Sequence, residues 1–223
     1  TRESAEQLSE RLRDVPYSTD ISRVPTDGDL YIFAVKDSAL LDLVSRMPSN
    51  RGLWVHTAGS MDMEVFAPYT ARYGVFYPMQ TFSKERETDF DDIPIFVETN
   101  HTDDTERLQK LAGRLSTKVY EATSEQRKYL HLAAVFACNF SNHLYALCDR
   151  ILSEHGLPFE TMLPLIRETA AKVADMPPAQ AQTGPAIRYD KNVIDKQMAL
   201  LSDPTMRQIY DLMSRSIHET NKH

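Results

Sequence analysis

Cysteine and long apolar runs are scarce in this sequence of 223 residues, and each shortage excludes a class of protein. The two cysteines, Cys138 and Cys148, fall in one predicted helix about 15 Å apart along its axis, too far to form a disulfide. No spacing of cysteine and histidine typical of zinc sites occurs, so a reducing, cytoplasmic location is expected. The longest apolar run, residues 132–138, is much shorter than the roughly 20 residues of a membrane span. We therefore expect no membrane association.

An excess of positive charge is also lacking. The 25 Lys and Arg residues are outnumbered by 32 Asp and Glu residues, which gives a net charge of -7. This balance argues against nucleic acid as a partner, although a helix N-terminus with an arginine can still bind one phosphate group. The hydrophobic content of 42% is enough for a buried core, and the length suits one large domain or two smaller ones.

Strands and helices are predicted to alternate over the first half of the chain. After a polar helix at 5–13, the predicted strands are 30–35, 53–56, 74–77, 93–98 and 118–120, with helices that begin near residue 37 and cover 102–115. The first of these strands is continuously apolar, so we expect it to be parallel to its neighbours and buried on both faces. Asp37 or Ser38 is the expected N-cap of the following helix.

From residue 124 onward only helices are predicted. One long helix covers 124–154, and three more cover 158–175, 190–201 and 204–219, with a proline-rich connector at 176–189. The predicted fold class is therefore α/β followed by all-α. We place one domain at 1–122 and an all-helical domain at 123–223.

The ends of two predicted strands carry groups suited to ligand binding. Ligands of open parallel sheets bind at the carboxyl ends of the strands, which here are residues 35–38 and 56–60. Gly59 would let a ligand approach the backbone, and the hydroxyls of Thr57 and Ser60 would supply hydrogen bonds. An ordinary strand-to-helix turn explains the same residues equally well.

Glycine accounts for only seven residues, and the G-x-G-x-x-G pattern of dinucleotide-binding folds is absent. The chain also begins at Thr1 close to a predicted helix, instead of with the strand that opens such a fold. We interpret both features as a truncation, with a first strand, its glycine loop, a helix and a second strand missing.

Polar residues recur on the long helix that is predicted to begin at residue 124. A uniform α-helix would bring His131, Cys138 and Asn142 within roughly 20° of one line, with Asn139 near its edge. Because the helix is otherwise apolar, these residues either line a polar cavity or are hydrogen-bonded groups of the core. Histidine can act as a general acid or base near neutral pH, and asparagine can bind a substrate hydroxyl or carboxylate.

Two further segments combine a rigid turn with polar groups. Arg188 follows the turn Gly184-Pro185, as an anion clamp would require, although a surface loop whose arginine caps a helix is an alternative. Gln80 lies in a similar segment at 77–83. The histidines at 218 and 223 are five residues apart instead of the four of a zinc-binding helix, so we predict no metal site.

Four segments taken in order resemble one protein family over essentially the whole chain: VHTAGS at 55–60, FYPMQTFSK at 76–84, HLAAVFACNFSNH at 131–143 and TGPAIRYD at 183–190. This family comprises predicted NAD(P)-dependent oxidoreductases that join a Rossmann-like domain to an all-helical C-terminal domain of unknown function. It is similar to pyrroline-5-carboxylate reductase and to the 6-phosphogluconate and 3-hydroxyisobutyrate dehydrogenases. The resemblance implies a Rossmann-like parallel sheet that lacks its N-terminal strand, loop and helix, followed by a helical dimerisation domain.

The resemblance also implies a cofactor, NADP or NAD, and the residues that bind it. In the complete Rossmann-like fold of the family, Thr1, Arg2 and Ser4 would lie just past the second strand, which precedes this sequence. This place is near the adenosine ribose or its 2′-phosphate, where the arginine favours NADP. The residues implied along the cofactor and around the nicotinamide are Val35, Lys36, Asp37, Thr57, Ala58, Gly59 and Ser60.

For catalysis, the resemblance places His131 and the asparagines at 139 and 142 on the catalytic helix. The related dehydrogenases have a lysine four residues before an asparagine there, whereas this sequence has Val135 and Cys138 at the two corresponding positions. His131 or Tyr77 is therefore the candidate for proton transfer, and family members commonly have histidine at the position of Tyr77.

Together these features predict an NADP-dependent oxidoreductase that transfers a hydride between nicotinamide and a small anionic substrate. Ser60, Gln80 and Arg188 would bind the substrate, and Asn139 and Asn142 would orient it. The long apolar helix favours a homodimer. Two alternatives stay open: a non-catalytic protein that responds to NAD(P) binding, favoured by the missing lysine, and a dimeric scaffold whose polar residues only specify helix packing.

Overall fold

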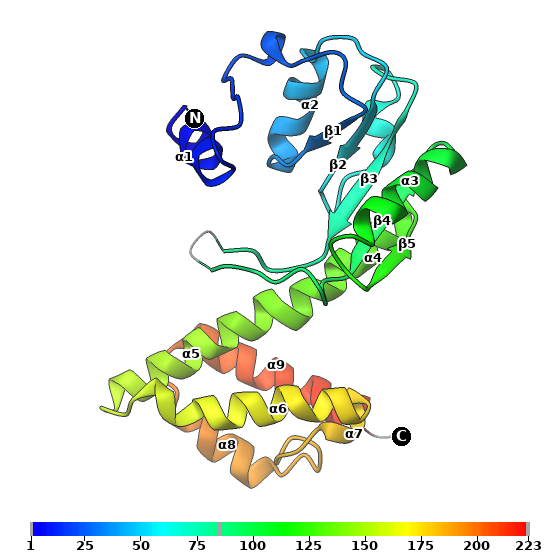
Figure 1. The fold of residues 1–223 in the computed structure, drawn as a ribbon. Helices are drawn as coiled ribbons and strands as arrows, with labels where there is room; N and C mark the ends of the chain where they lie inside the picture. Colours follow the sequence, from blue (N-terminus) through cyan, green and yellow to red (C-terminus); the bar gives the residue numbers. More distant parts are fainter. Residues whose placement is uncertain (1, 84–85, 222–223) are drawn as a thin grey trace. The chain divides into compact units, whose positions relative to one another are not determined.

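The strands of the first half of the chain form one five-stranded sheet, with helices between some of them (Figure 1). The computed structural model describes residues 2–83 and 86–221. The strands are β1 (Leu30–Phe33), β2 (Leu53–His56), β3 (Tyr73–Pro78), β4 (Ile95–Thr99) and β5 (Val119–Glu121), and they lie side by side in chain order. All five predicted strands are present, with ends that differ by a few residues.

The expectation of a wholly parallel sheet is wrong at one pair of strands. β1, β2 and β3 are parallel to one another, and β4 is parallel to β5, but β3 and β4 are antiparallel. A parallel connection needs a crossover, usually a helix. The connection between β3 and β4 has no helix in its described residues, 79–83 and 86–94. The chain therefore returns as an antiparallel strand.

Alternating side chains of the strands divide the core between the two faces of the sheet. On one face, α2 (Asp37–Ser45) and the 3-10 helix η2 (Met63–Phe66) cover an aromatic cluster in which Phe33 lies 5.5 Å from Trp54 and 5.2 Å from Phe66 between ring centroids. On the other face, α3 (Thr102–Ala112) packs Leu108 against Val55. The sheet is therefore covered on both faces, as the α/β pattern predicts.

The first strand departs from its expected environment. Phe33 is buried, but Ile32 is 50% exposed, because β1 is the edge strand of the described sheet.

The predicted cap of the next helix is also wrong. Lys36 is the N-cap of α2 and makes no capping hydrogen bond with its side chain, while Asp37 is the first helical residue. Before β1, α1 (Arg2–Arg11) has no buried residue, and the short 3-10 helix η1 (Ile21–Arg23) follows.

The predicted long helix is interrupted by a wider turn. α4 (Ser124–Ala134) begins with a capping box of Thr123 and Gln126, the π-helical segment η3 (Val135–Phe140) follows, and α5 (Ser141–Glu154) completes the run. A π turn accommodates an extra residue, so the angular steps of a uniform α-helix do not hold across it. The uniform helix on which the predicted alignment of His131 with residues 138 and 142 rests is therefore interrupted at 135–140.

The chain divides into two units, Thr1–Asn139 and Phe140–His223. Residue 122, where we place the domain boundary from the sequence, is the position at which the strands end, whereas the two units divide inside η3. The second unit holds α5, η4 (Phe159–Met162), α6 (Leu163–Asp175), α7 (Pro178–Ala181), α8 (Lys191–Leu200) and α9 (Pro204–Thr220). No helix in the described residues is long and apolar enough to cross a membrane.

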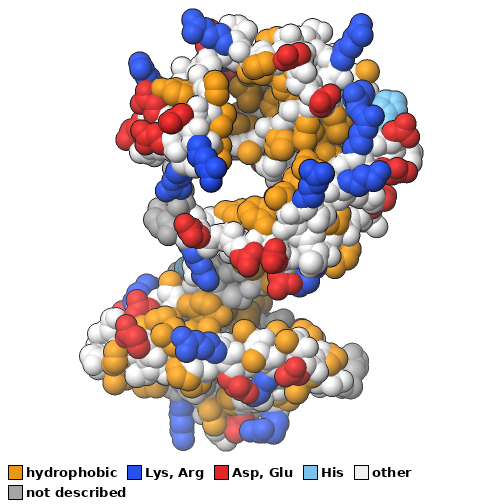
Figure 2. All heavy atoms as spheres, viewed as in Figure 1, with side chains coloured by type: hydrophobic (Ala, Val, Ile, Leu, Met, Phe, Trp, Pro, Cys, Tyr) orange, Lys and Arg blue, Asp and Glu red, His pale blue; other side chains and the backbone are white. Residues whose placement is uncertain are grey.

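The helical unit buries little apolar surface by itself. Among its described residues, only three hydrophobic side chains are buried, those of Ala186, Ile194 and Met206. Hydrophobic side chains remain visible over its surface (Figure 2).

Cys148 of this unit and Cys138 of the first unit are both free thiols, as their spacing predicts.

Candidate functional site

The carboxyl ends of the three parallel strands bring together side chains from separate turns. Ser60, in the turn after β2, donates a hydrogen bond of 2.5 Å from its Oγ to Oδ2 of Asp37, which follows β1. Thr57 contributes its backbone N–H, which donates to the carbonyl oxygen of Phe33 at 3.3 Å. The two strand ends that the sequence indicates are therefore adjacent in space.

Gly59 lies where two aromatic rings from other elements meet. The Tyr77 hydroxyl, on β3, is 3.4 Å from Nδ1 of His131, on α4. A Cβ atom added to Gly59 would lie 2.7 Å from Nδ1 of His131 and 2.9 Å from the Tyr77 hydroxyl oxygen, closer than real Cβ contacts. Glycine lets the backbone approach both groups, and a side chain at this position would displace at least one of them. We call Gly59, Tyr77 and His131 the glycine cradle.

Tyr77 and His131 differ in their exposure to water. Tyr77 is 9% exposed, and burial raises the pKa of its phenol, an effect that the positive charge of Arg127 partly opposes. The phenol therefore keeps its proton at neutral pH and can donate it. His131 is exposed on the first unit, so its ring is in contact with water. Tyr77 is therefore placed to act as a proton donor, and His131 is placed to return a proton to Tyr77.

His56, at the end of β2, lies in the predicted strand-end segment 56–60, but the sequence does not reveal its role. It is fully buried, and its Nδ1 accepts a 3.2 Å hydrogen bond from the backbone N–H of Ala58. Its Nε2 lies 3.4 Å from the carbonyl oxygen of Asp62. Burial, with a smaller effect of the Arg127 charge, lowers the pKa of His56 to about 4. A neutral histidine therefore fixes both ends of the turn that contains Gly59.

A buried ion pair lies beside the cradle and is also absent from the sequence predictions. The Arg127 side chain is inaccessible to solvent, and its Nη1 donates to Oε2 of Glu98 at 2.6 Å. Glu98 also accepts hydrogen bonds from the backbone N–H and hydroxyl of Ser124, at the start of α4. In the sequence, Glu98 and Arg127 are two charged residues next to apolar segments. Charged residues in such positions are most often exposed to solvent, so the sequence does not predict that these two form a buried ion pair.

The other residues implied along the cofactor lie near the same strand ends. Val35 and Lys36 are exposed between β1 and α2, and Ala58 is half-buried beside Gly59. On α1, Arg2 donates to Glu6 at 3.0 Å and Ser4 is exposed. Thr1 lies outside the described residues.

Four predicted substrate residues are not brought into the cradle by any contact that the structure describes. Gln80 is exposed, and its Oε1 accepts a hydrogen bond from the backbone N–H of Thr81. Asn139 is exposed in η3. Asn142 and Arg188 are exposed residues of the second unit. Within residues 2–83 and 86–221, no group of three or more His, Cys, Asp or Glu residues could hold a metal ion.

Comparison with known proteins identifies the family. A family model described as a domain of unknown function, DUF2520, matches residues 93–217. The chain is 51% identical to a protein from Bacteroides fragilis, provisionally named an NADP oxidoreductase, and covers 98% of its own length and 86% of that chain with a TM-score of 0.90. The chain belongs to the DUF2520 family. The resemblance inferred from the four sequence segments is thereby confirmed.

More distant solved structures share the fold of this DUF2520 protein. A 1-pyrroline-5-carboxylate reductase from Streptococcus pyogenes is 12% identical, with a TM-score of 0.60 and coverage of 97% of this chain and 86% of that one. A reductive aminase from Aspergillus terreus, in complex with NADPH and ethyl-5-oxohexanoate, is also 12% identical, with a TM-score of 0.71 and coverage of 97% and 83%. The search of curated proteins finds no match.

Proposed function

We propose that this DUF2520 protein is an NADP-dependent oxidoreductase in which the glycine cradle receives the nicotinamide ring. The observation that carries the proposal is the meeting of Gly59, Tyr77 and His131 at the carboxyl ends of parallel strands, where ligands of such sheets bind. The provisional name of the 51% identical relative supports the same cofactor. Arg2 is exposed on α1 and supplies the positive charge that would favour NADP over NAD.

The residues present fit only one end of such a cofactor. Gly59 brings the backbone against the Tyr77 and His131 rings, beside which the nicotinamide would bind, and Asp37, bound to Ser60, offers a polar border for the adjoining ribose. The diphosphate needs a glycine-rich loop, and the sequence contains no G-x-G-x-x-G. Among the described strands, β1 pairs only with β2, so its outer edge can accept another strand. We propose that the full-length protein supplies the loop and strands there.

Tyr77 and His131 divide the handling of the proton in this proposal. A nicotinamide bound beside these residues would supply or accept a hydride at a substrate carbon. Tyr77 donates its phenolic proton to the substrate oxygen or nitrogen, and His131 returns a proton to Tyr77 from water. The reverse direction runs through the same two groups. The substrate is small and anionic in this proposal, with Ser60, Gln80 and Asn139 of the first unit as its candidate contacts.

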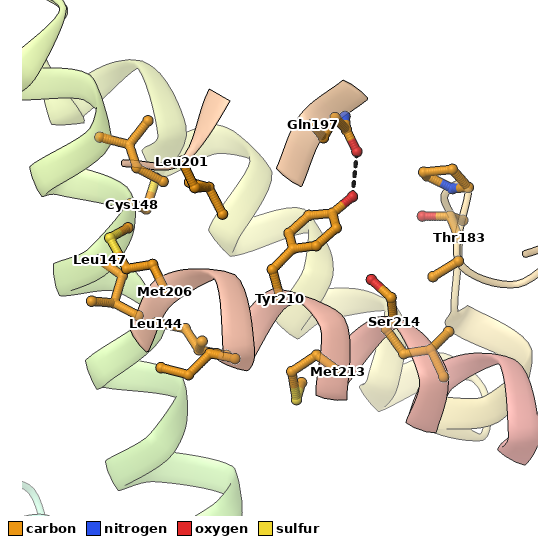
Figure 3. A pocket seen from close by; sticks show the side chains of 15 residues that line it. Leu144, Leu147, Cys148, Thr183, Gln197, Leu201, Met206, Tyr210, Met213 and Ser214 are labelled. Atoms are coloured by element: carbon orange, nitrogen blue, oxygen red, sulfur yellow. Dashed lines mark hydrogen bonds between the residues drawn. The ribbon is translucent and has the colours of Figure 1, made fainter. Parts of the chain in front are cut away.

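We propose further that the helical unit associates with a second copy. A cavity of about 430 Å³ in this unit is lined by Leu144 and Leu147 of α5 and by Met206 and Met213 of α9, while Tyr210 donates to Gln197 at its margin (Figure 3). Helices α5, α6 and α7 have no buried residue. A helical unit with so little core needs a partner to cover its apolar faces, and symmetric homodimers are the commonest solution.

Titration of the full-length protein with NADPH and NADH, followed by a substrate screen read by NADPH absorbance, tests the proposal. Tight binding of NADPH with turnover that requires Tyr77 supports it. Absence of binding to both cofactors contradicts it and leaves the dimeric scaffold.

A protein that responds to NAD(P) without catalysis is the second candidate, and one observation favours it. Val135 and Cys138 occupy the two positions where the related dehydrogenases would have a lysine. Tight NADPH binding with no turnover across the substrate screen would identify this function.

A further inference from the structure

Arg127 is a buried charged residue, and a contribution to stability does not by itself explain why it is buried. Its Nη2 donates to the carbonyl oxygen of Met61 at 2.5 Å and to Oγ of Ser124 at 3.1 Å, while Nη1 pairs with Glu98. Its Nε has no hydrogen-bond partner among the described residues. Burying an ion pair costs desolvation free energy, and well-packed apolar residues are often at least as stable.

The ion pair and the cradle join the same two elements. Arg127 and His131 are four residues apart on α4, so both side chains project from one face of that helix. Glu98 on β4 is the register partner of Val75, which is two residues before Tyr77 on the same face of the sheet. The Glu98 to Arg127 and Tyr77 to His131 contacts are therefore successive links between the sheet and α4.

Arg127 also reaches the third component of the cradle. The carbonyl that it binds belongs to Met61, two residues after Gly59. One guanidinium group thus connects α4, β4 and the turn after β2 by directed hydrogen bonds. Lysine could not make this arrangement, because only the planar fork of arginine presents several donors in fixed directions.

We propose that Arg127, held by Glu98, is a positioning residue for proton transfer. It fixes His131 and the Gly59 turn against Tyr77 and keeps a positive charge behind the phenol. This inference rests on the proposed function, because it concerns the same proton. The proposed role explains why Arg127 and Glu98 form an ion pair at a position where apolar side chains could also pack.

The charge of Arg127 has a measurable effect on Tyr77. Burial raises the pKa of the phenol, and Arg127 lowers it, because a nearby positive charge favours the phenolate. Removal of the charge should therefore raise the Tyr77 pKa further and make the phenol a weaker acid. The loss of an ion pair that does not lie near Tyr77 would leave this titration unchanged.

The test compares Arg127→Met and Arg127→Lys with the wild type in the full-length protein. NMR titration of ¹³C-labelled tyrosine, assigned with Tyr77→Phe, is done without cofactor. In Arg127→Met the Tyr77 titration should move to higher pH, and kcat should fall about 100-fold with a smaller change in KM, because misplaced groups lose that much rate. Arg127→Lys should restore most of the Tyr77 titration but only part of kcat.

Arg72→Met is the matched control, since Arg72 forms an ion pair with the buried carboxylate of Asp104 elsewhere in the same unit. It should lower stability and leave the Tyr77 titration unchanged. If Arg127→Met does not fold, Glu98→Gln/Arg127→Met removes both charges and should show the same upward shift.

An unchanged Tyr77 titration in the folded variant overturns the inference, and so does an unchanged kcat in a variant whose titration is shifted. A shifted titration in a protein without turnover supports the role of Arg127 and contradicts only the proposed catalytic function.

Discussion

At the residue scale, Tyr77 carries the chemistry of the proposed reaction. Its phenol keeps the proton because burial raises its pKa, and His131 is its only titratable hydrogen-bond partner that the structure describes. We expect Tyr77→Phe to lower kcat about 100-fold or more, the usual contribution of a general acid, and to leave NADPH affinity unchanged. Tyr129→Phe is the control, since Tyr129 is 67% exposed on the same helix as His131. Unchanged kcat in Tyr77→Phe would remove the phenol from the mechanism.

His56 gives a prediction about pH and stability. Its pKa is about 4 in the folded protein and near 6.5 when the chain is unfolded. Above pH 6.5 the imidazole is neutral in both states, and its contribution is complete. As the pH falls from 6.5 toward 4, the unfolded chain binds a proton that the folded protein does not, so the free energy of unfolding should decrease by about 3 kcal/mol.

Urea unfolding at a series of pH values measures this decrease. His56→Gln should flatten the stability profile between pH 4 and 6.5. His155→Gln should not, because His155 is exposed at the end of α5. An equally steep profile in His56→Gln would show that other groups cause the pH dependence.

The residues of the site differ in how far the sequence reveals them. Gly59, Ser60 and Asp37 could be predicted, because the rule that ligands bind at strand ends needs only the order of strands and turns. The role of His56, which lies in the same strand-end segment as Gly59, and the ion pair of Arg127 could not be predicted, because the role of a buried polar residue depends on its hydrogen-bond partners in the folded chain. The partner of Arg127 is Glu98, 29 residues earlier in the chain.

At the scale of single elements, the start of α4 sets the rotation of the helix that carries His131. The Thr123 side chain accepts a hydrogen bond from the backbone N–H of Gln126 at 3.2 Å, and Gln126 Oε1 accepts one from the backbone N–H of Thr123 at 2.9 Å. Thr123→Ala should lower the free energy of unfolding by about 1 kcal/mol. Thermal unfolding measures the loss, and Thr123→Ser, which retains the hydroxyl, should recover most of it. An equal loss in both variants would contradict the capping role.

β4 and η3 depart from prediction in different ways. The apolar run at 93–98 predicts a strand but not its direction, which depends on whether the preceding connection crosses the sheet. Position 135 begins a π turn inside a segment whose composition suits an α-helix throughout. No residue of η3 is buried, so neither the composition nor the packing of this segment predicts the extra residue.

At the scale of the whole molecule, the helical unit should be stable only as a dimer. Sedimentation of the full-length protein should give a dimer at micromolar concentration. Met213→Glu places a charge in the apolar cavity of this unit and should shift the protein toward monomer. Leu8→Glu, at an exposed position of α1, should not. A stable monomer in the wild type would contradict the proposed association.

The affinity of Gly59→Ala for NADPH tests most directly whether the glycine cradle receives the nicotinamide ring. The added methyl group would come within 2.9 Å of both Tyr77 and His131 and displace these side chains from the positions in which they would border the ring. We predict that calorimetry of the full-length protein shows at least about a tenfold loss of affinity, roughly 1.4 kcal/mol, with the folded structure retained. Gly113→Ala, at the end of α3, should bind like the wild type. Wild-type affinity in Gly59→Ala would contradict the account.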